Sequence, residues 1–115
     1  MMPAKASAKF VRISPFKMRQ VANLVRGMNV NQAMSMLKLM NKGAALPIYR
    51  VIKSALANAT DLANEQNPVD VDRLFVATIR ADEGPTMKRI RARAQGRAYR
   101  VRKRTSHLFV ELGQK

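Results

Sequence analysis

A densely basic stretch that precedes an apolar segment limits how this chain can fold. Arginine and lysine side chains are almost never fully buried without partners, so this stretch cannot join a hydrophobic core. A run of like charge is usually a solvated loop or a disordered tail. Because the strand-like residues 107–110 follow it, we expect an arm that is anchored in the fold instead. Its nine bases are Lys88, Arg89, Arg91, Arg93, Arg97, Arg100, Arg102, Lys103 and Arg104.

The sequence on either side of this stretch is typical of two antiparallel strands, residues 69–81 and 99–112. About 16 residues separate the two strands, whereas hairpin loops usually have two to five. If the strands continue into the arm, it extends on the order of 25 Å beyond the core, at about 3.3 Å per residue. Like charges on adjacent strands repel each other, so we expect an arm that is mobile alone and ordered against a polyanion.

The chain has a formal net charge of +15, unevenly distributed over its 115 residues. Residues 1–60 hold ten bases and no acid, residues 61–83 hold two bases and six acids, and residues 84–115 hold ten bases and one acid. Such an excess of positive charge is typical of a protein that neutralises a polyanion. Arginine dominates the arm, and its planar group can bind phosphate bidentately.

The composition excludes several other classes of protein. Hydrophobic residues make up 47% of the chain, which is enough for the core of one domain. With no cysteine and one histidine, the chain offers no disulfide, thiolate metal site or multi-histidine cluster. No apolar run approaches the roughly 18 residues of a membrane span, and the N-terminus has no apolar signal segment. We therefore expect no metal, no cofactor and no membrane partner.

Two amphipathic helices are predicted in the first part of the chain. The first begins at a Ser14 cap and ends at Gly27, which we expect in a left-handed conformation. The second begins at an Asn31 cap and is broken at residues 41–43. Their predicted core-facing residues are Met18, Val21, Leu24 and Val25 in the first helix and Ala33, Met34, Leu37 and Met40 in the second.

A third helix is expected from near Ala44 to the Asn67–Pro68 dipeptide, and a short strand in residues 4–13. Within residues 69–81, apolar residues occupy mostly odd positions, so we expect one buried face and a partly covered opposite face. The predicted core-facing residues are Ile48, Val51, Ile52, Ala55, Ala59, Leu62 and Ala63 of the helix and Val69, Val71, Phe75, Ala77 and Ile79 of the strand.

Two acidic residues, Asp70 and Asp72, fall on the other face of this predicted strand. That spacing fits a pair of metal ligands, but neither a histidine nor a third anchored acid accompanies them. We expect turn chemistry and charge balance beside Arg73 and Arg80. For His107 we expect a hydrogen bond at the end of a strand, or a contact with RNA, and no catalytic role.

Three segments of the sequence appear together in one known family. They are RISPFKMRQVANLVRG at residues 12–27, SALANAT at residues 54–60 and DEGPTMKRIRARAQGRAYRVRKRTSH at residues 82–107. With these motifs in this order, nearly the whole chain resembles the universal large-subunit ribosomal protein twenty-two family, of the bacterial type. Any one of the short motifs alone would be a weak signal.

The resemblance implies an α+β fold, with three helices packed on a small three-stranded antiparallel sheet and a long protruding β-hairpin. We expect one domain, with its globular part at about residues 1–80 and 100–115 and the hairpin arm at about 81–99. The implied function is that of a structural constituent of the large ribosomal subunit, which binds 23S-type rRNA and assists assembly. The implied location is the ribosome in the cytoplasm, with an organellar ribosome as the alternative.

The resemblance also implies that the tip of the hairpin lines the polypeptide exit tunnel. There it would face large-subunit protein four and the nascent peptide, at a place where macrolide resistance arises. No homo-oligomer is implied. Ala92 departs from the family pattern, in which proline is common at this position and fixes the φ angle. Mapped by motif, the tip is Met87, Lys88, Arg89, Ile90, Arg91, Ala92 and Arg93.

RNA contacts are predicted for two sets of bases. The first set is the nine bases of the arm, which we expect to bind backbone phosphates, while RNA shape provides specificity. For the second set the alternative is an exposed, solvated face, but the first half of the chain holds no acid to balance it. This second set is Lys9, Arg12, Lys17 and Arg19.

A different class of protein also fits part of the pattern. Architectural DNA-binding proteins with basic β-arms are small, basic and helical at the start, but they place an apolar wedge at the arm tip and dimerise through their helices. Here Pro85 lies at the base of the arm and arginine fills its tip. An enzyme is not supported, because the sequence has no nucleophile–base pair, metal cluster or cofactor loop.

Overall fold

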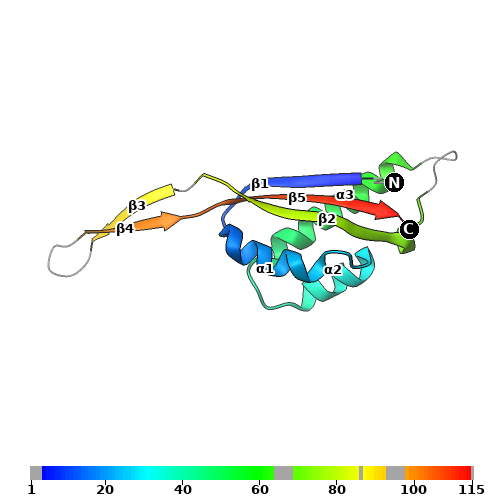
Figure 1. Ribbon diagram of the computed structural model, residues 1–115, viewed down its shortest axis with the longest axis horizontal. Helices are drawn as coiled ribbons and strands as arrows, with labels where there is room; N and C mark the ends of the chain where they lie inside the picture. Colours follow the sequence, from blue (N-terminus) through cyan, green and yellow to red (C-terminus); the bar gives the residue numbers. More distant parts are fainter. Residues whose placement is uncertain (1–3, 64–68, 86, 93–97, 115) are drawn as a thin grey trace.

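The computed structural model describes residues 4–63, 69–85, 87–92 and 98–114. Strand β1 is followed by three helices and then by four strands, with one turn of 3-10 helix before β2 (Figure 1). In chain order the elements are β1 (Ala4–Val11), α1 (Pro15–Val25), α2 (Val30–Leu39), α3 (Ala45–Leu62), a 3-10 turn (Val71–Arg73), β2 (Leu74–Glu83), β3 (Met87–Ala92), β4 (Ala98–Lys103) and β5 (Ser106–Gln114).

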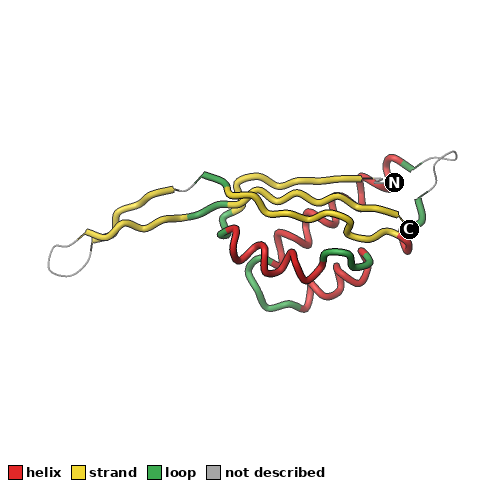
Figure 2. Tube along the Cα trace, in the orientation of Figure 1, coloured by secondary structure: helices red, strands yellow, loops and turns green. Residues whose placement is uncertain are grey.

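The strands form two separate antiparallel sheets. Three of them form a sheet in the order β1–β5–β2, so the last strand of the chain is the central one. The other two, β3 and β4, pair only with each other among the described residues and extend away from the globular part (Figures 1 and 2). This confirms the predicted α+β fold, with three helices on a three-stranded sheet and a protruding hairpin.

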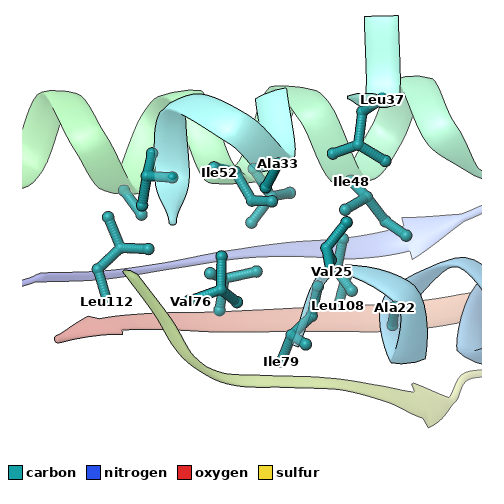
Figure 3. Packing of buried hydrophobic residues seen from close by; sticks show 14 of the residues in the cluster. Ala22, Val25, Ala33, Leu37, Ile48, Ile52, Val76, Ile79, Leu108 and Leu112 are labelled. Carbon is teal, nitrogen blue, oxygen red and sulfur yellow. The ribbon is translucent and has the colours of Figure 1, made fainter. Parts of the chain in front are cut away.

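The helices cover one face of the three-stranded sheet (Figures 1 and 3). On β5 the alternation is regular, because Leu108, Val110 and Leu112 are buried while His107 and Phe109 are half-buried. This confirms the period-two pattern predicted for the last segment. Facing these residues on α3 are side chains that recur every three or four positions, which confirms the predicted stripe as far as Ala59, whereas Ala63 at its end is half-buried. The buried residues are Ile48, Val51, Ile52, Ala55 and Ala59.

The beginning of β2 differs from the prediction. The strand begins at Leu74 rather than at residue 69, because residues 71–73 turn as a 3-10 helix. The carboxylate of Asp70 accepts a hydrogen bond from the amide of Asp72 at 3.1 Å, which stabilises this turn. The two acids therefore do not share a strand face, and the expected turn chemistry is what the structure shows.

The buried face of β2 also differs from the prediction, because the strand contains an irregularity. Its register against β5 shifts between Val76 and Thr78, as at a β-bulge, which exchanges the two faces of the strand. Leu74 and Val76 are buried before the shift, and Ile79 and Ala81 are buried after it. Of the odd positions predicted to face the core, Ile79 is buried, whereas Val69, Val71, Phe75 and Ala77 are half-buried.

The first two helices follow the predicted signals except at one cap and one core position. Gly27, just beyond α1, has a φ of 80° and confirms the expected left-handed conformation. The cap of α2 is Asn29 and not Asn31, because the Asn29 side chain accepts a hydrogen bond from the amide of Asn31 at 2.9 Å. Leu24 is 53% exposed, and Ala22 is buried in its place.

The third helix ends earlier than the proline-based prediction. α3 ends at Leu62, and the backbone of Ala63 is already extended, with a ψ of 140°. The Asn67–Pro68 dipeptide, the predicted end of the helix, lies outside the described residues, as does the side chain of Leu62. At the other end the start near Ala44 is confirmed, since Ala44 is the cap residue and Pro47 lies in the first turn.

The hairpin makes the molecule long and narrow. Its principal dimensions are 68 × 24 × 16 Å, and its radius of gyration is 17.5 Å. A compact domain of about 100 residues has a radius of gyration of about 13 Å. The difference reflects β3 and β4, which lie outside the globular part (Figure 1).

Candidate nucleic-acid interface

The backbone register of the hairpin is fixed by six pairs of residues, from Met87 with Lys103 to Ala92 with Ala98. Of these six described pairs, one places two bases directly opposite each other, Lys88 with Arg102. The other bases are paired with uncharged residues, as in Arg89 with Val101. Directly opposed like charges destabilise a ladder, so this register reduces the repulsion within an arm that carries many positive charges.

The register also locates the predicted tip residues along the arm. Met87 begins β3 at the end nearest the globular part, and Ala92 ends it at the far end. The described part of the predicted tip segment, residues 87–92, therefore forms the whole of β3. Arg93 and Arg97 lie outside the described residues.

The base of the hairpin is joined to the globular part by buried polar side chains. Thr105 is 4% exposed, and its hydroxyl donates to the Pro85 carbonyl at 2.6 Å. Ser106 is 0% exposed, and its hydroxyl donates to the carbonyl of Ile13, which lies between β1 and α1. The Gly84 amide donates to the Thr105 carbonyl at 3.0 Å. Because buried hydroxyls are costly to leave unpaired, these bonds hold the root of the arm in one geometry.

His107 belongs to this base and is satisfied by a hydrogen bond, as expected. Its Nδ1 accepts from the backbone amide of Phe10 at 3.1 Å, and the two rings meet edge to face at 5.0 Å. The bond coincides with a break in the β1 ladder between Ala8 and Val11, where Phe10 has a φ of 59°. The histidine thus stabilises an irregular strand end.

Arg19, one of the predicted RNA-binding residues, makes a bond within the chain. Its Nε donates to the carbonyl of Ala81 at 3.0 Å, and the neighbouring Arg26 donates to the carbonyl of Ile79 at 2.6 Å. Both carbonyls belong to β2, an edge strand of the sheet. An uncovered edge strand is prone to pair with other chains, so the two arginines of this helical segment protect that edge.

Lys9 lies on the sheet face that the helices leave open. It lines a hollow of about 240 Å³ together with Arg80, Asp82 and Phe109. Arg80 and Asp82 pair at 3.2 Å, and the guanidinium of Arg80 lies 4.7 Å from the centroid of the Phe109 ring. Arg80 is therefore already engaged, and Lys9 is the free base of this hollow within the described part of the chain.

Arg12 and Lys17 lie together at a larger hollow, which a third base completes. This hollow, of about 470 Å³, lies beside the start of α1, and its third base is Lys42 from the loop between α2 and α3. Figure 2 shows this loop passing beside the start of α1, near the root of the hairpin. Lys42 was not among the predicted site residues, because the only signal around it in the sequence was the helix break at residues 41–43.

The described residues contain no group of three histidine, cysteine or acidic side chains that could hold a metal ion. Among the same residues, no helix is long and apolar enough to cross a membrane.

The fold and the charged surfaces together define a small α+β protein with a protruding cationic hairpin. The chain belongs to the ribosomal protein L22p/L17e family, which it matches over residues 6–113. It is 51% identical over 116 residues to the large ribosomal subunit protein uL22 of Desulfitobacterium hafniense strain Y51, covering 100% of this chain and 97% of that protein. It is 49% identical over 114 residues to the protein of the same name from Clostridioides difficile strain 630, covering 99% of each.

These relatives confirm the resemblance indicated by the three sequence motifs. Membership of this family makes the chain a structural protein of the large ribosomal subunit, a role that is not enzymatic. It also favours the ribosomal hypothesis over an architectural DNA-binding protein with basic arms.

Proposed function

We propose that this protein binds large-subunit rRNA as a structural constituent of the subunit, and that it does so through two surfaces. One is the arm with its nine bases, and the other is the basic flank of the globular part around Arg12 and Lys17. The observation that carries the proposal is the hairpin itself, a cationic ladder that lies outside the globular part.

The physical argument concerns charge. A two-stranded sheet is at best marginally stable alone in water, and like charges along both strands weaken it further. Phosphates on both sides of the arm would neutralise that charge, and arginine can bind each phosphate through two parallel bonds. Such contacts position a protein without reading sequence, so the shape of the rRNA would provide specificity.

The predicted tip segment, residues 87–93, is proposed to line the polypeptide exit tunnel with its far end, of which the structure describes Arg91 and Ala92. Within the described ladder, Ala92 and its partner Ala98 lie at the end away from the globular part, and the bonds of Thr105 and Ser106 fix the direction in which the arm leaves the domain. In that position it would contact the nascent peptide and large-subunit protein four, and would influence macrolide binding. Assistance in subunit assembly would follow from contacts with several rRNA segments.

The test is to measure binding of the full chain to a large-subunit rRNA fragment and to duplex DNA of equal length, across a series of salt concentrations. We expect tighter binding to rRNA at every salt concentration, because the protein would recognise the shape of the rRNA in addition to its charge. Charge alone would favour the duplex DNA at least equally. A preference for duplex DNA, or a stable dimer in solution, would support the architectural DNA-binding protein and contradict the proposal. Retention on the large subunit after a high-salt wash provides an independent readout.

A further inference from the structure

The larger hollow beside the start of α1 has the shape of a ligand site. It is formed where β1 ends, where α1 begins and where the loop between α2 and α3 returns. Its volume of about 470 Å³ lies within the range of about 300–1,000 Å³ that is usual for small-ligand pockets. Its lining residues are Arg12, Ile13, Ser14, Lys17, Gln20, Val21, Lys42, Gly43 and Ala44.

The charge of this hollow has one sign. Arg12, Lys17 and Lys42 are all exposed, and within the described part of the chain none of them has an ion-pair partner. No acid is among the lining residues, and residues 1–60 contain none. Three unpaired bases around one concave site attract an anion more strongly than the same bases on a flat surface.

The wall of the hollow is apolar. Val21 and Ala44 are buried, so among the apolar lining residues the half-buried Ile13 is the one that presents hydrophobic surface beneath the bases. Gln20 adds an exposed amide that can both donate and accept hydrogen bonds. An apolar surface adds nothing to the binding of a free phosphate, whereas a nucleobase or ribose would pack against it.

We propose that this hollow binds one unstacked nucleotide of single-stranded RNA, with its flanking phosphates on Arg12, Lys17 and Lys42 and its base against Ile13. Unpaired bases that are turned out of a stack are the usual targets of sequence-specific RNA recognition. This proposal rests on the proposed function, because it takes rRNA as the source of the nucleotide.

The hollow is also joined to the root of the arm. Ile13, one of its lining residues, accepts the hydrogen bond from Ser106, the first residue of β5. The hollow and the root of the arm therefore share a fixed geometry, which would allow both to contact the same rRNA. A nucleotide held here would fix the position of the globular part while the arm follows the RNA backbone.

The first test is a titration of the isotopically labelled full chain, followed by NMR, with the four 5′-nucleoside monophosphates, ribose 5-phosphate and inorganic phosphate. We expect shifts at the backbone amides of Ile13, Gln20, Gly43 and Ala44, and tighter binding of the nucleotides than of ribose 5-phosphate or phosphate. Equal binding of all three kinds of probe would show an anion site without base recognition and would overturn the proposal. Shifts spread over all basic residues, or no shifts, would also overturn it.

Variants localise the effect. Lys42→Gln lies in an exposed loop and should weaken nucleotide binding by at least about fivefold, because a charged hydrogen bond is removed. The matched control is Lys53→Gln, an exposed lysine of α3 outside the hollow, which should bind as the unchanged chain does. Equal weakening in the two variants would overturn the site.

A second measurement separates this proposal from the proposed function. In the chain with Arg12, Lys17 and Lys42 all changed to glutamine, the salt slope of rRNA binding should fall by about 0.7 for each phosphate that is no longer bound. An unchanged slope with intact rRNA binding would overturn the nucleotide site and leave the arm as the interface. A hexaglutamate peptide that displaces the nucleotide at equal concentration would indicate a protein partner and would also overturn it.

Discussion

Gly84 occupies a position at the root of the arm where no larger residue fits. A Cβ atom built there would lie 2.5 Å from the Thr105 hydroxyl oxygen and 3.3 Å from the His107 ring. The Thr105 hydroxyl is buried and bonded to Pro85, so it cannot move aside without breaking that bond. The small size of this residue therefore allows the two strands to approach closely where the arm begins.

We predict that Gly84→Ala destabilises the protein by about 1–3 kcal/mol, the usual cost of overpacking a tight site. The free energy of unfolding is measured by urea titration. The matched control is Gly43→Ala, since a Cβ at Gly43 has no atom within 4 Å, and that variant should unfold at nearly the unchanged urea concentration. Equal destabilisation in both variants would contradict the steric explanation.

Individual basic residues also differ in their partners, although the sequence alone does not distinguish those bonded within the chain from those that are unpaired. Arg19 and Arg26 bind carbonyls on the edge of β2, whereas Arg12, Lys17 and Lys42 are unpaired within the described chain. Arginine donates several hydrogen bonds in a fixed plane, so one residue can hold an edge strand and still have donors to spare. The first pair therefore contributes to the fold, and Arg19 remains a proposed RNA contact only through its other donors.

At the scale of elements, β4 and its continuation into β5 carry the densest group of bases. In the hairpin register Arg100 pairs with Ile90 and Arg102 with Lys88. Arg104 follows β4 and is exposed. Bases spread along an extended strand in this way can each contact a separate phosphate.

We predict that changing Arg100, Arg102, Lys103 and Arg104 to glutamine lowers the salt slope of rRNA binding, by about 0.7 for each single-strand phosphate that the arm no longer binds. The slope is measured from binding constants across a series of salt concentrations. Changing Arg50 and Lys53, two exposed bases of α3, to glutamine is the control and should leave the slope nearly unchanged. An unchanged slope in the arm variant would place its four bases in solvent.

At the scale of the whole molecule, the protein is a small domain with a long arm. Its longest dimension, 68 Å, far exceeds the other two, 24 and 16 Å. The helices stabilise the sheet from one side, while in the described part of the arm β3 and β4 pair with each other away from the helices (Figure 1). The proposed roles follow this division: the globular part anchors the protein on the rRNA, and the arm extends along the rRNA to the exit tunnel.

We predict that shortening the arm changes the tunnel without preventing assembly. Deleting Met87–Arg89 together with their partners Val101–Lys103 preserves the remaining register and removes roughly 10 Å, at about 3.3 Å per residue. Large subunits should still form on sucrose gradients, while the response of the ribosomes to macrolides should change. Failure of the subunits to form would instead assign these residues to an RNA contact that assembly requires.

Local sequence patterns determined much of this protein. The Ser14 cap, the left-handed Gly27, the stripe of α3 and the alternation in β5 all follow from interactions within a few residues, so the sequence predicts them. The three helices, the hairpin and its basic character are predictable for the same reason, with the family resemblance adding the sheet.

Only the tertiary structure decided the features that join distant segments. The bulge in β2 depends on its pairing with β5, and the Asn29 cap is supported by a bond of 2.8 Å from its side chain to the carbonyl of Asp72. The hollow brings Lys42 beside Arg12 and Lys17 through the packing of a loop against a helix. A periodic pattern reports which face of one segment is apolar, but not which side chains of separate segments meet, because packing determines that.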